Sequence, residues 1–232
     1  MGHDDAGDLL PDDGITLYPV GLCLRGCRVI VAGGGVVAER RVGRLIAAGA
    51  EVILVAPEAT PALQARAEAG DIVWHRRPAA PEDFADMRLA FICTNDPSVN
   101  ADLARAARAR GAWVNRADAP QHSDFLVPAV ADLSPVQVAV LTGGLAPTVG
   151  RYLCQQIERI MGAETAAVVA LAARIRSAVR SRVATQPERA AVIAAALDEE
   201  VLAVLRSEGL EAAYSQALKK MALGSPDRRP SA

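Results

Sequence analysis

"RVIVAGGGVVAERRVGRLIAAGAEVILVAP", Arg28 to Pro57, is the stretch of sequence that decides the fold. It begins with the β-branched run Val29–Val31, which stops at three consecutive glycines, as a short strand buried on both faces does. Apolar residues then recur at helical spacing, and Gly49 ends that pattern before a second apolar run begins. The recurring positions are Ala38, Val42, Leu45 and Ile46, and the second run is Val52–Val55. The order strand, glycine turn, helix, strand predicts a βαβ unit.

The glycine turn fits the pattern G-x-G-x-x-A from Gly33 to Ala38. Gly33 permits a tight turn, Gly35 lets a pyrophosphate approach the backbone, and the small Ala38 lets helix and strand pack closely. The free N–H groups of the helix then face the phosphates. We therefore predict that Gly33, Gly34 and Gly35 bind a dinucleotide. The alternative is a tight strand-to-helix turn without a ligand.

The second strand ends in Ala56 and Pro57, where an acidic residue for the ribose hydroxyls is usual. Glu58 is the nearest candidate, and the alternative is a solvated acid near the start of the next helix. No basic residue follows this strand closely, which favours NAD over NADP as the cofactor.

Strands and helices continue to alternate after Glu58. Further strands are predicted from Asp71, from Leu89 and from Ala112, with a helix between the last two, so the whole forms a parallel sheet with helices on its faces. Thr94 and Asn95 follow the fourth strand, at the carboxyl edge where ligands of such sheets lie. They are either cofactor contacts or the loop and cap that precede a helix.

After Asn115 the pattern changes to two strand-like runs joined by a Ser-Pro turn, and then to helices with breaks near Pro187 and Gly209. We predict an α/β fold: a Rossmann-type parallel sheet, a small strand-helix dimerisation region and a helical carboxyl-terminal region. The expected divisions are a disordered leader (1–14), an NAD-binding Rossmann domain (15–118), a dimerisation and substrate region (119–162), a helical region (163–223) and a flexible tail (224–232).

Composition is that of a soluble enzyme. The net charge of −2 gives no electrostatic footprint for nucleic acid or an anionic membrane, so neither is expected as a partner. No apolar stretch reaches membrane-spanning length, and the acidic start is not a secretory signal, so we expect a cytoplasmic protein. The four cysteines and three histidines lack metal-ligand spacing, so no bound metal is predicted.

Four stretches in order, "GGGVVAERRVGRLIAAGAEV", "CTNDPSVN", "VNRADAPQHSDFLVPA" and "LTGGLAPTVGR", resemble the precorrin-2 dehydrogenase and sirohydrochlorin ferrochelatase family, which includes the amino-terminal part of bacterial siroheme synthases. The similarity covers about Leu17 to Met161. It implies NAD-dependent oxidation of the tetrapyrrole precorrin-2 to sirohydrochlorin, insertion of ferrous iron in some members, and a homodimer.

The resemblance also assigns residues. An aspartate that acts in both steps of the family matches Asp118, and family cofactor contacts match Val36, Val37, Pro57 and Glu58. The chain has Asn95 where the family commonly has Asp, which makes a polar role of that loop less certain.

Chemistry independently favours a carboxylate at Asp118, because hydride departure leaves a cationic macrocycle that must lose a proton. The alternative interpretation is that Asp118 is an ordinary aspartate that forms a turn. Thr142, Gly143 and Gly144 precede a helix and are predicted to bind a substrate carboxylate, or else form a glycine-rich helix start. The family commonly has Ser in place of Thr142, and Thr keeps the hydroxyl.

Two other functions fit the glycine turn. One is a regulatory module that senses NAD(H) without chemistry, which would not need the Asp118 segment. The other is a different NAD-dependent dehydrogenase, which would usually show a catalytic His, Lys or Tyr near the fourth strand, and none is found there.

Overall fold

The computed structural model describes residues 14–180 and 183–223 of the chain. It divides into two compact units. The first combines the chain up to Pro128 with Leu141–Pro147, and the second combines Ala129–Val140 with the chain from Thr148 onward. The predicted leader at 1–13 and tail at 224–232 lie outside the described residues. Gly14, which we had assigned to the leader, is described and is buried.

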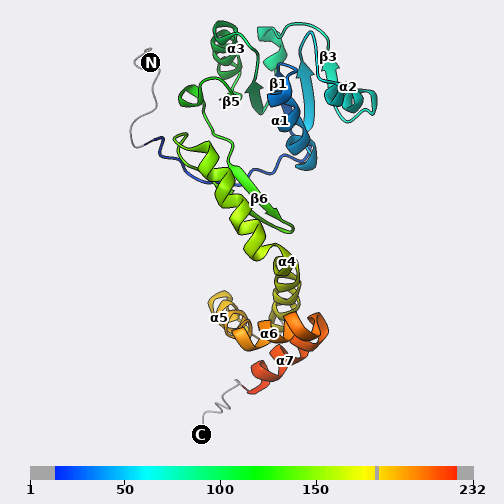
Figure 1. The fold of residues 1–232 in the computed structure, drawn as a ribbon, viewed down its shortest axis with the longest axis vertical. Coiled ribbons are helices and arrows are strands. Elements are labelled where there is room, and N and C mark those ends of the chain that lie inside the picture. The colour runs from blue at the N-terminus through cyan, green and yellow to red at the C-terminus, as the bar shows by residue number, and fades with distance from the viewer. Residues whose placement is uncertain (1–13, 181–182, 224–232) are drawn as a thin grey trace. The chain divides into compact units, whose positions relative to one another are not determined.

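The first unit is built on one sheet of five parallel strands in the order β3-β2-β1-β4-β5, as predicted for a Rossmann-type fold (Figure 1). The strands are β1 (Arg28–Ala32), β2 (Glu51–Val55), β3 (Val73–His75), β4 (Leu89–Ile92) and β5 (Trp113–Arg116). The chain order reverses between β1 and β4, where Ala32 lies between Val55 and Ile92 in register. Ligands of such sheets bind outside the carboxyl ends of the strands at this reversal.

Helices cover both faces of the sheet because the strand residues alternate between two buried clusters. Val29 and Val31 pack with α1 (Val36–Ala47) and α2 (Pro61–Glu68) in the first cluster. Ile30 and Ala32 pack in the second cluster with α3 (Pro97–Ala109) and with Phe84 of the short 3-10 helix η1 (Pro81–Phe84). Both faces of β1 are therefore apolar, which is why its sequence shows a continuous β-branched run.

The predicted first helix has the expected end but an earlier start. It begins at Val36, two residues before Ala38, so its first turn lies directly against the glycines. At its end Gly49 has a φ of 78°, and its N–H donates to the Ile46 carbonyl at 2.9 Å. The third predicted strand is limited to Val73–His75, and the 3-10 helices η1 and η2 (Pro120–His122) were not predicted.

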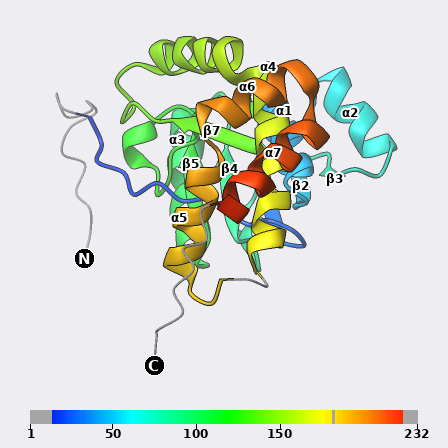
Figure 2. The same cartoon turned by 90° about the horizontal axis from the view of Figure 1, so that it is seen from below.

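The second unit contains an antiparallel hairpin and a group of helices. The hairpin strands are β6 (Ala129–Leu133) and β7 (Val136–Val140), joined at the predicted Ser-Pro turn. The helices are α4 (Pro147–Arg180), α5 (Gln186–Ala196), α6 (Glu199–Glu208) and α7 (Leu210–Leu223). Figure 2 shows α5, α6 and α7 gathered around the second half of α4. Leu171 and Ile175 of α4 are fully buried there with Val201 of α6.

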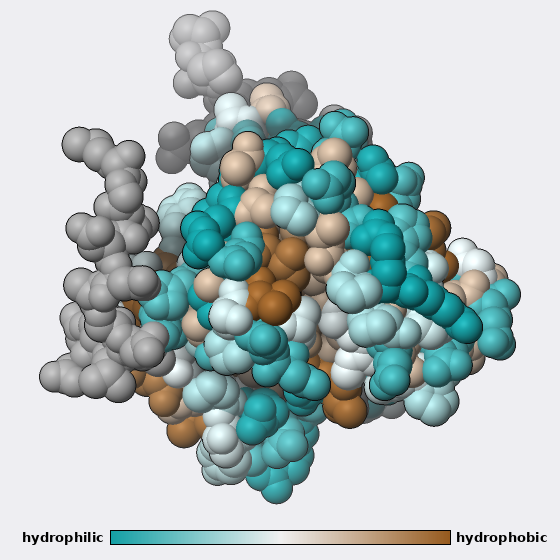
Figure 3. Space-filling model, turned by 90° about the horizontal axis from the view of Figure 1, so that it is seen from above, coloured by the Kyte–Doolittle hydropathy of each residue, from teal (hydrophilic) through white to brown (hydrophobic). Residues whose placement is uncertain are grey.

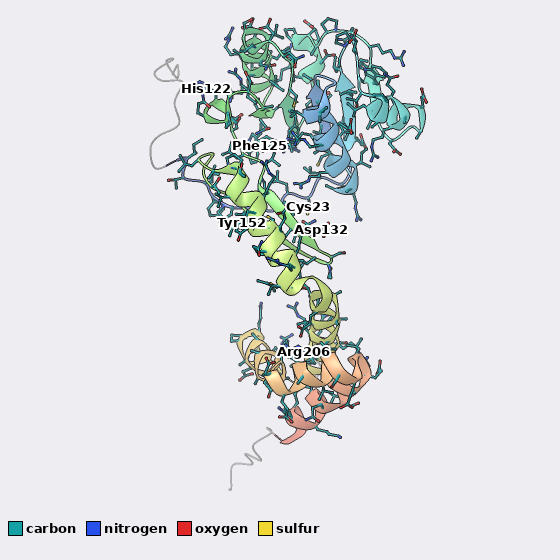
Figure 4. The ribbon with its side chains drawn as sticks, in the orientation of Figure 1. Cys23, His122, Phe125, Asp132, Tyr152 and Arg206 are labelled. Carbon is teal, nitrogen blue, oxygen red and sulfur yellow. The ribbon has the colours of Figure 1, made fainter. Side chains whose placement is uncertain are left out.

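Side chains at the surface of this helical group form ion pairs between helices. Arg206 of α6, labelled in Figure 4, pairs with Glu164 of α4 at 2.9 Å and, within its own helix, with Glu199 at 2.5 Å. Lys220 of α7 pairs with Asp198 at 2.5 Å. Exposed pairs of this kind contribute little free energy, so the buried cluster is the main source of stability in this unit.

The helix breaks agree with the sequence prediction at two places and differ at a third. Pro187 lies in the first turn of α5, and Gly209 separates α6 from α7, as expected. The break before α6 was missed, although Asp198 caps that helix by accepting the Val201 N–H at 3.0 Å. The predicted division between 162 and 163 falls inside α4, which is continuous there.

One face of the surface is mainly polar. The face drawn in Figure 3 is hydrophilic over most of its area, and hydrophobic residues occur on it in small groups. Of the helices in the described part of the chain, none combines the length and apolar character needed to cross a membrane.

We expect the replacement Leu171→Ala to lower the free energy of unfolding of the helical group by about 2–5 kcal/mol, because it leaves a cavity at a fully buried position. Ser177→Ala is the matched control on the same helix, because Ser177 is exposed. The measurement is denaturant unfolding followed by circular dichroism. Both tryptophans lie in the first unit, so their fluorescence transition should not move.

Candidate functional site

At two glycines of the turn after β1, the neighbouring backbone lies so close that a side chain would not fit. Gly33 has a φ of 112°, and a Cβ there would lie 2.5 Å from the carbonyl oxygen of Cys93 at the end of β4. A Cβ on Gly34 would overlap the carbonyl oxygen of Glu58, which follows β2. The turn is therefore wedged between the ends of β4 and β2, and glycine is required at both positions.

Gly35 is glycine for a different reason. A Cβ placed there would meet no atom within 4 Å, and Gly35 forms the cap of α1 with a φ of −82°. The first N–H groups of a helix have no partner within the helix, and they carry the positive end of its dipole. A phosphate can approach this open backbone, so the turn is suited to a dinucleotide.

A cleft of about 700 Å³ lies at the carboxyl edge of the sheet, beside this turn. Seven predicted site residues line it: Gly33, Gly34, Gly35, Pro57, Glu58, Thr94 and Asn95. Further lining residues were not predicted, among them Ala56, Thr60, Pro78, Ala79, Val99 and Leu103. Those near Pro78 follow the short strand β3, whose end lies beside β2 only because of the sheet order.

The predicted contacts Val36 and Val37 are not among the residues that line the cleft. The Val36 side chain is 65% exposed, and Val37 packs against the first core cluster. Their backbone N–H groups belong to the first turn of α1, so any contact from them to a ligand is through the backbone.

The loop after β4 is held by a buried side chain of α3. The hydroxyl of Thr94 donates to Oδ1 of Asn100 at 2.6 Å, and Nδ2 of Asn100 donates to the Thr94 carbonyl at 3.2 Å. Asp96 caps α3 by accepting the N–H groups of Ser98 and Val99 at 2.8 and 3.2 Å. The loop thus both lines the cleft and starts the helix.

Asp118 follows β5 and forms an ion pair with Arg116. Nη2 of Arg116 lies 2.7 Å from Oδ2 of Asp118, and the two side chains are 11% and 24% exposed. Burial raises the pKa of the Asp118 carboxyl, but the hydrogen-bonded Arg116 guanidinium, with a smaller contribution from the Asn100 side chain, outweighs burial and brings this pKa below its usual value. Asp118 is therefore an ionised carboxylate at neutral pH.

Cys93, at the floor of the cleft, is a neutral thiol. Burial raises the pKa of this thiol to about 11, while Arg41 of α1 lowers it and Asp118 raises it. Burial also lowers the pKa of the Arg41 guanidinium. The charges of Arg41 and Asp118 thus both act on the end of β4, although neither residue lines the cleft.

One buried polar atom near β4 lacks a partner within the described residues. Asn115 of β5 is 4% exposed; its Nδ2 donates to the Phe125 carbonyl at 2.9 Å, and its Oδ1 has no hydrogen-bond partner. Phe125, on the segment after β5 (Figure 4), packs edge-on against Phe91 at 5.4 Å between ring centroids.

Thr142, Gly143 and Gly144 lie away from the cleft lining and contact the start of the described chain. Ile15 donates its N–H to the Gly143 carbonyl at 3.0 Å, and a Cβ on Gly143 would crowd Ile15. The Thr142 hydroxyl accepts the Ala146 N–H at 3.2 Å. Local packing alone thus accounts for the glycine at 143, and the assignment of a substrate carboxylate here stays a prediction.

Histidine, cysteine and acidic side chains do not gather in threes into a metal-binding group anywhere in the described part of the chain.

Comparison with known proteins agrees with this geometry. A family model described as "Putative NAD(P)-binding" matches residues 20–129. The siroheme synthase of Chromobacterium violaceum is 34% identical over 214 residues, which are 92% of this chain and 46% of that protein. The siroheme synthase of Xylella fastidiosa (strain M12) is 39% identical over 170 residues, which are 72% of this chain and 35% of that protein. The chain is thus similar to siroheme synthases over most of its own length, and its residues 20–129 match the NAD(P)-binding family.

Its first unit is an NAD(P)-binding domain of that family. The chain spans less than half the length of these siroheme synthases. A solved structure titled "SirC, precorrin-2 dehydrogenase" has the same fold, with a TM-score of 0.73 at 20% identity, covering 88% of this chain and all of that one.

The open space at Gly35 allows a clean test of the cofactor site. We expect Gly35→Val to lower dinucleotide affinity by more than tenfold, because the new side chain occupies the approach to the backbone N–H groups. Its melting temperature should stay near that of the parent, because no atom lies within 4 Å of the added Cβ. The measurements are a calorimetric titration with NAD and a thermal melt.

Gly34→Ala is the matched control, and it should instead destabilise the fold because its Cβ overlaps the Glu58 carbonyl. Unchanged NAD affinity in Gly35→Val would contradict the placement of the pyrophosphate at this turn.

Proposed function

We propose that this protein oxidises precorrin-2 to sirohydrochlorin with NAD. The ionised Asp118, held beside a cleft that fits a dinucleotide, is the observation that carries the proposal. The similarity to siroheme synthases and the fold of a precorrin-2 dehydrogenase support the choice of substrate. Ferrous iron is the second substrate that the resemblance implies for some members of the family.

The reaction removes one hydride and one proton from precorrin-2. A bound nicotinamide supplies the acceptor for the hydride. The chain's own task is then to stabilise the positive charge left on the macrocycle and to take up the proton. The Asp118 carboxylate does both, because its negative charge favours the cation and its oxygens can accept the proton. A lowered pKa makes a weaker base, so charge stabilisation is the larger part of its contribution.

The cofactor is NAD rather than NADP, because the two arginines that follow β3 already have partners. Arg77 follows β3 and donates to both carboxylate oxygens of Asp83, at 2.8 and 2.5 Å. The guanidinium of Arg76 stacks 4.1 Å from the centroid of the Trp74 ring. Glu58 lines the cleft after β2, where its carboxylate can accept the ribose hydroxyls and would repel a 2′-phosphate.

Thr142, Gly143 and Gly144 bind a carboxylate of the substrate in this proposal. Precorrin-2 carries many carboxylates, and these residues precede the first turn of α4. The Thr142 hydroxyl caps the turn, so its replacement would affect both the helix start and the substrate.

We expect Asp118→Ala to lower the turnover of precorrin-2 by roughly 10²- to 10⁴-fold, because it removes the group that stabilises charge and accepts the proton. Asp118→Asn should be nearly as impaired, since a neutral amide does not accept a proton at neutral pH. NAD affinity should barely change in either variant, because Asp118 does not line the cleft. Anaerobic incubation with precorrin-2 and NAD, followed by NADH absorbance, measures turnover.

The same assay separates the other function classes. A chain that binds NAD but never forms NADH with precorrin-2 is better explained as an NAD(H)-sensing module, and the proposal would then fail. Ferrous iron added at the end point reports whether sirohydrochlorin is converted further.

The protein also forms a homodimer in this proposal, through an exposed apolar face of α4. The side chains of this face are 42–80% exposed: Val149, Tyr152, Leu153, Ile160 and Met161. Tyr152 is labelled in Figure 4, on the first half of the helix. Their spacing of three, four and seven residues places them along one side, and apolar stripes of this kind mark interfaces.

We expect the parent to sediment as a dimer and Ile160→Glu to shift it toward the monomer, because a charge would be buried at the interface. Gln155→Glu adds the same charge elsewhere on the helix and is the control. Sedimentation velocity at several concentrations measures the mass, and a monomeric parent would refute the dimer.

A further inference from the structure

Arg41 is a half-buried arginine on the face of α1 that packs against the sheet. The buried positions of this helix include Ala38 and Leu45, which lie three residues before Arg41 and four residues after it. Residues at these spacings are neighbours on a helix surface, so Arg41 belongs to the edge of the buried face. Val37, one turn before Arg41, packs against the first core cluster. The charge of Arg41 is therefore held partly out of water.

The Arg41 guanidinium has no hydrogen-bond or ion-pair partner among the residues that the structure describes. Glu39, the acidic residue in the first turn of α1, is bound elsewhere, because its Oε2 accepts the Thr60 hydroxyl at 2.6 Å. Asp118 is paired with Arg116. A partly desolvated charge without a partner destabilises a fold. Arg41 is therefore suited to an anion that comes from outside the chain.

The flank of α1 that carries Arg41 faces β4 and β5. Glu39 contacts the start of α2, and α2 joins β2 to β3 on the other side of β1. At about 3.6 residues per turn, Arg41 lies roughly 160° around the helix from Glu39, on the opposite flank. Helical side chains lean toward the amino end of their helix, which for α1 lies at the carboxyl edge of the sheet. Arg41 thus extends toward the edge at which Asp118 follows β5.

Two other observations agree with this placement. Phe125, on the segment after Asp118, packs against the same core cluster as α1. Burial raises the pKa of the Cys93 thiol to about 11, while Arg41 lowers it and Asp118 raises it, so both charges lie near the end of β4. The thiol is uncharged at neutral pH and is no counter-ion for Arg41.

Two more arginines of α1 add positive charge around Arg41. Arg40 and Arg44 are exposed, and the guanidinium of neither has a hydrogen-bond or ion-pair partner within the described part of the chain. Arg44 lies four residues after Arg40 and three after Arg41, and like charges at these spacings destabilise a helix. Positive charge that is not balanced locally attracts anions to this flank.

We propose that Arg41 binds a carboxylate side chain of the substrate, and that Arg40 and Arg44 strengthen the attraction. The inference rests on the proposed function, in which the substrate is a tetrapyrrole with many carboxylates. The planar guanidinium can donate two parallel N–H groups to one carboxylate. This contact holds the macrocycle at the edge of the sheet that carries Asp118, and it leaves the dinucleotide cleft free because Arg41 does not line that cleft.

Four variants of the full chain test this contact. Arg41→Gln removes the charge, Arg41→Lys keeps the charge but loses the paired donors, and Arg41→Met places an apolar chain at the half-buried position. Arg110→Gln is the matched control, because it makes the same charge change at an exposed residue, the C-cap of α3. The probe is sirohydrochlorin, the product of the proposed reaction. Its affinity is measured anaerobically by absorbance titration, and the affinity for NAD by calorimetry.

We expect Arg41→Gln and Arg41→Met to bind sirohydrochlorin about 10- to 100-fold more weakly than the parent, because a charge-assisted hydrogen bond is lost. Arg41→Lys should lose about 3- to 10-fold, and Arg110→Gln should bind as the parent does. NAD affinity should stay unchanged in all four variants. The pyrophosphate of NAD is the other anion near α1, so a loss of NAD affinity with unchanged sirohydrochlorin affinity would assign Arg41 to the cofactor and overturn the inference.

Two further measurements separate a ligand-binding arginine from a structural one. In thermal melts without ligand, Arg41→Met should melt at or above the temperature of the parent, because the lost charge was unpaired. A much lower melting temperature would show a structural role and overturn the inference. With precorrin-2, Arg41→Gln should raise KM by about 10- to 100-fold and leave kcat within about threefold, because the contact is the same in the ground and transition states. A reduced kcat with the KM of the parent would contradict substrate binding.

Binding and turnover together distinguish this inference from the proposed function. If the parent binds and oxidises the tetrapyrrole and Arg41→Gln has the affinity of the parent, the inference is wrong and the proposed function stands. If the parent neither binds sirohydrochlorin nor oxidises precorrin-2, both are wrong.

Discussion

The close passage of the glycine turn between the ends of β4 and β2 is the constraint on which the rest of the site depends. At Gly33 and Gly34 the backbone runs against the carbonyls of Cys93 and Glu58, with no room for a side chain. This contact fixes α1 over the point where the strand order reverses, with its first turn facing the cleft. The N–H groups and the dipole of α1 then meet whatever anion enters. Because Gly33 and Gly34 have no Cβ atom, the positive end of the α1 dipole can lie at the cofactor site.

The second constraint is the start of α3, which organises the opposite wall of the cleft. Its cap, Asp96, and its buried Asn100 both hold the loop after β4, while the Pro97 carbonyl accepts a hydrogen bond from Arg116, the ion-pair partner of Asp118. An unpaired carboxylate in this partly buried position would have a raised pKa. The donors around it reverse that effect, so the carboxylate stays charged, as the proposed oxidation of precorrin-2 requires. The same donors restrict its orientation.

Local patterns in the sequence predicted the elements whose causes are local. The strand-turn-helix unit from Val29 to Val55 was predicted because a β-branched run, glycines and helical spacing are adjacent in the chain. The contact of Arg116 with the first turn of α3 was not, because Pro97 and Arg116 are remote in sequence and the pairing of β4 with β5 brings them together. The contact of Ile15 with Gly143 is equally non-local. The break before α6 did have a local signal, an Asp followed by acidic residues at a helix start, which we overlooked.

The proposed preference for NAD over NADP depends on residues that lie beside the end of β2 in the sheet rather than on those that follow β2 in the sequence. No basic residue follows β2 closely in the sequence. In the sheet, however, β3 lies beside β2, and Arg76 and Arg77 follow the end of β3. A 2′-phosphate would need one of these cations. Arg77, however, is held by Asp83, whose side chain is only 7% exposed, and freeing it would leave that carboxylate buried without its partner. The proposed preference for NAD therefore depends less on the absence of basic residues than on the cost of separating Arg77 from Asp83.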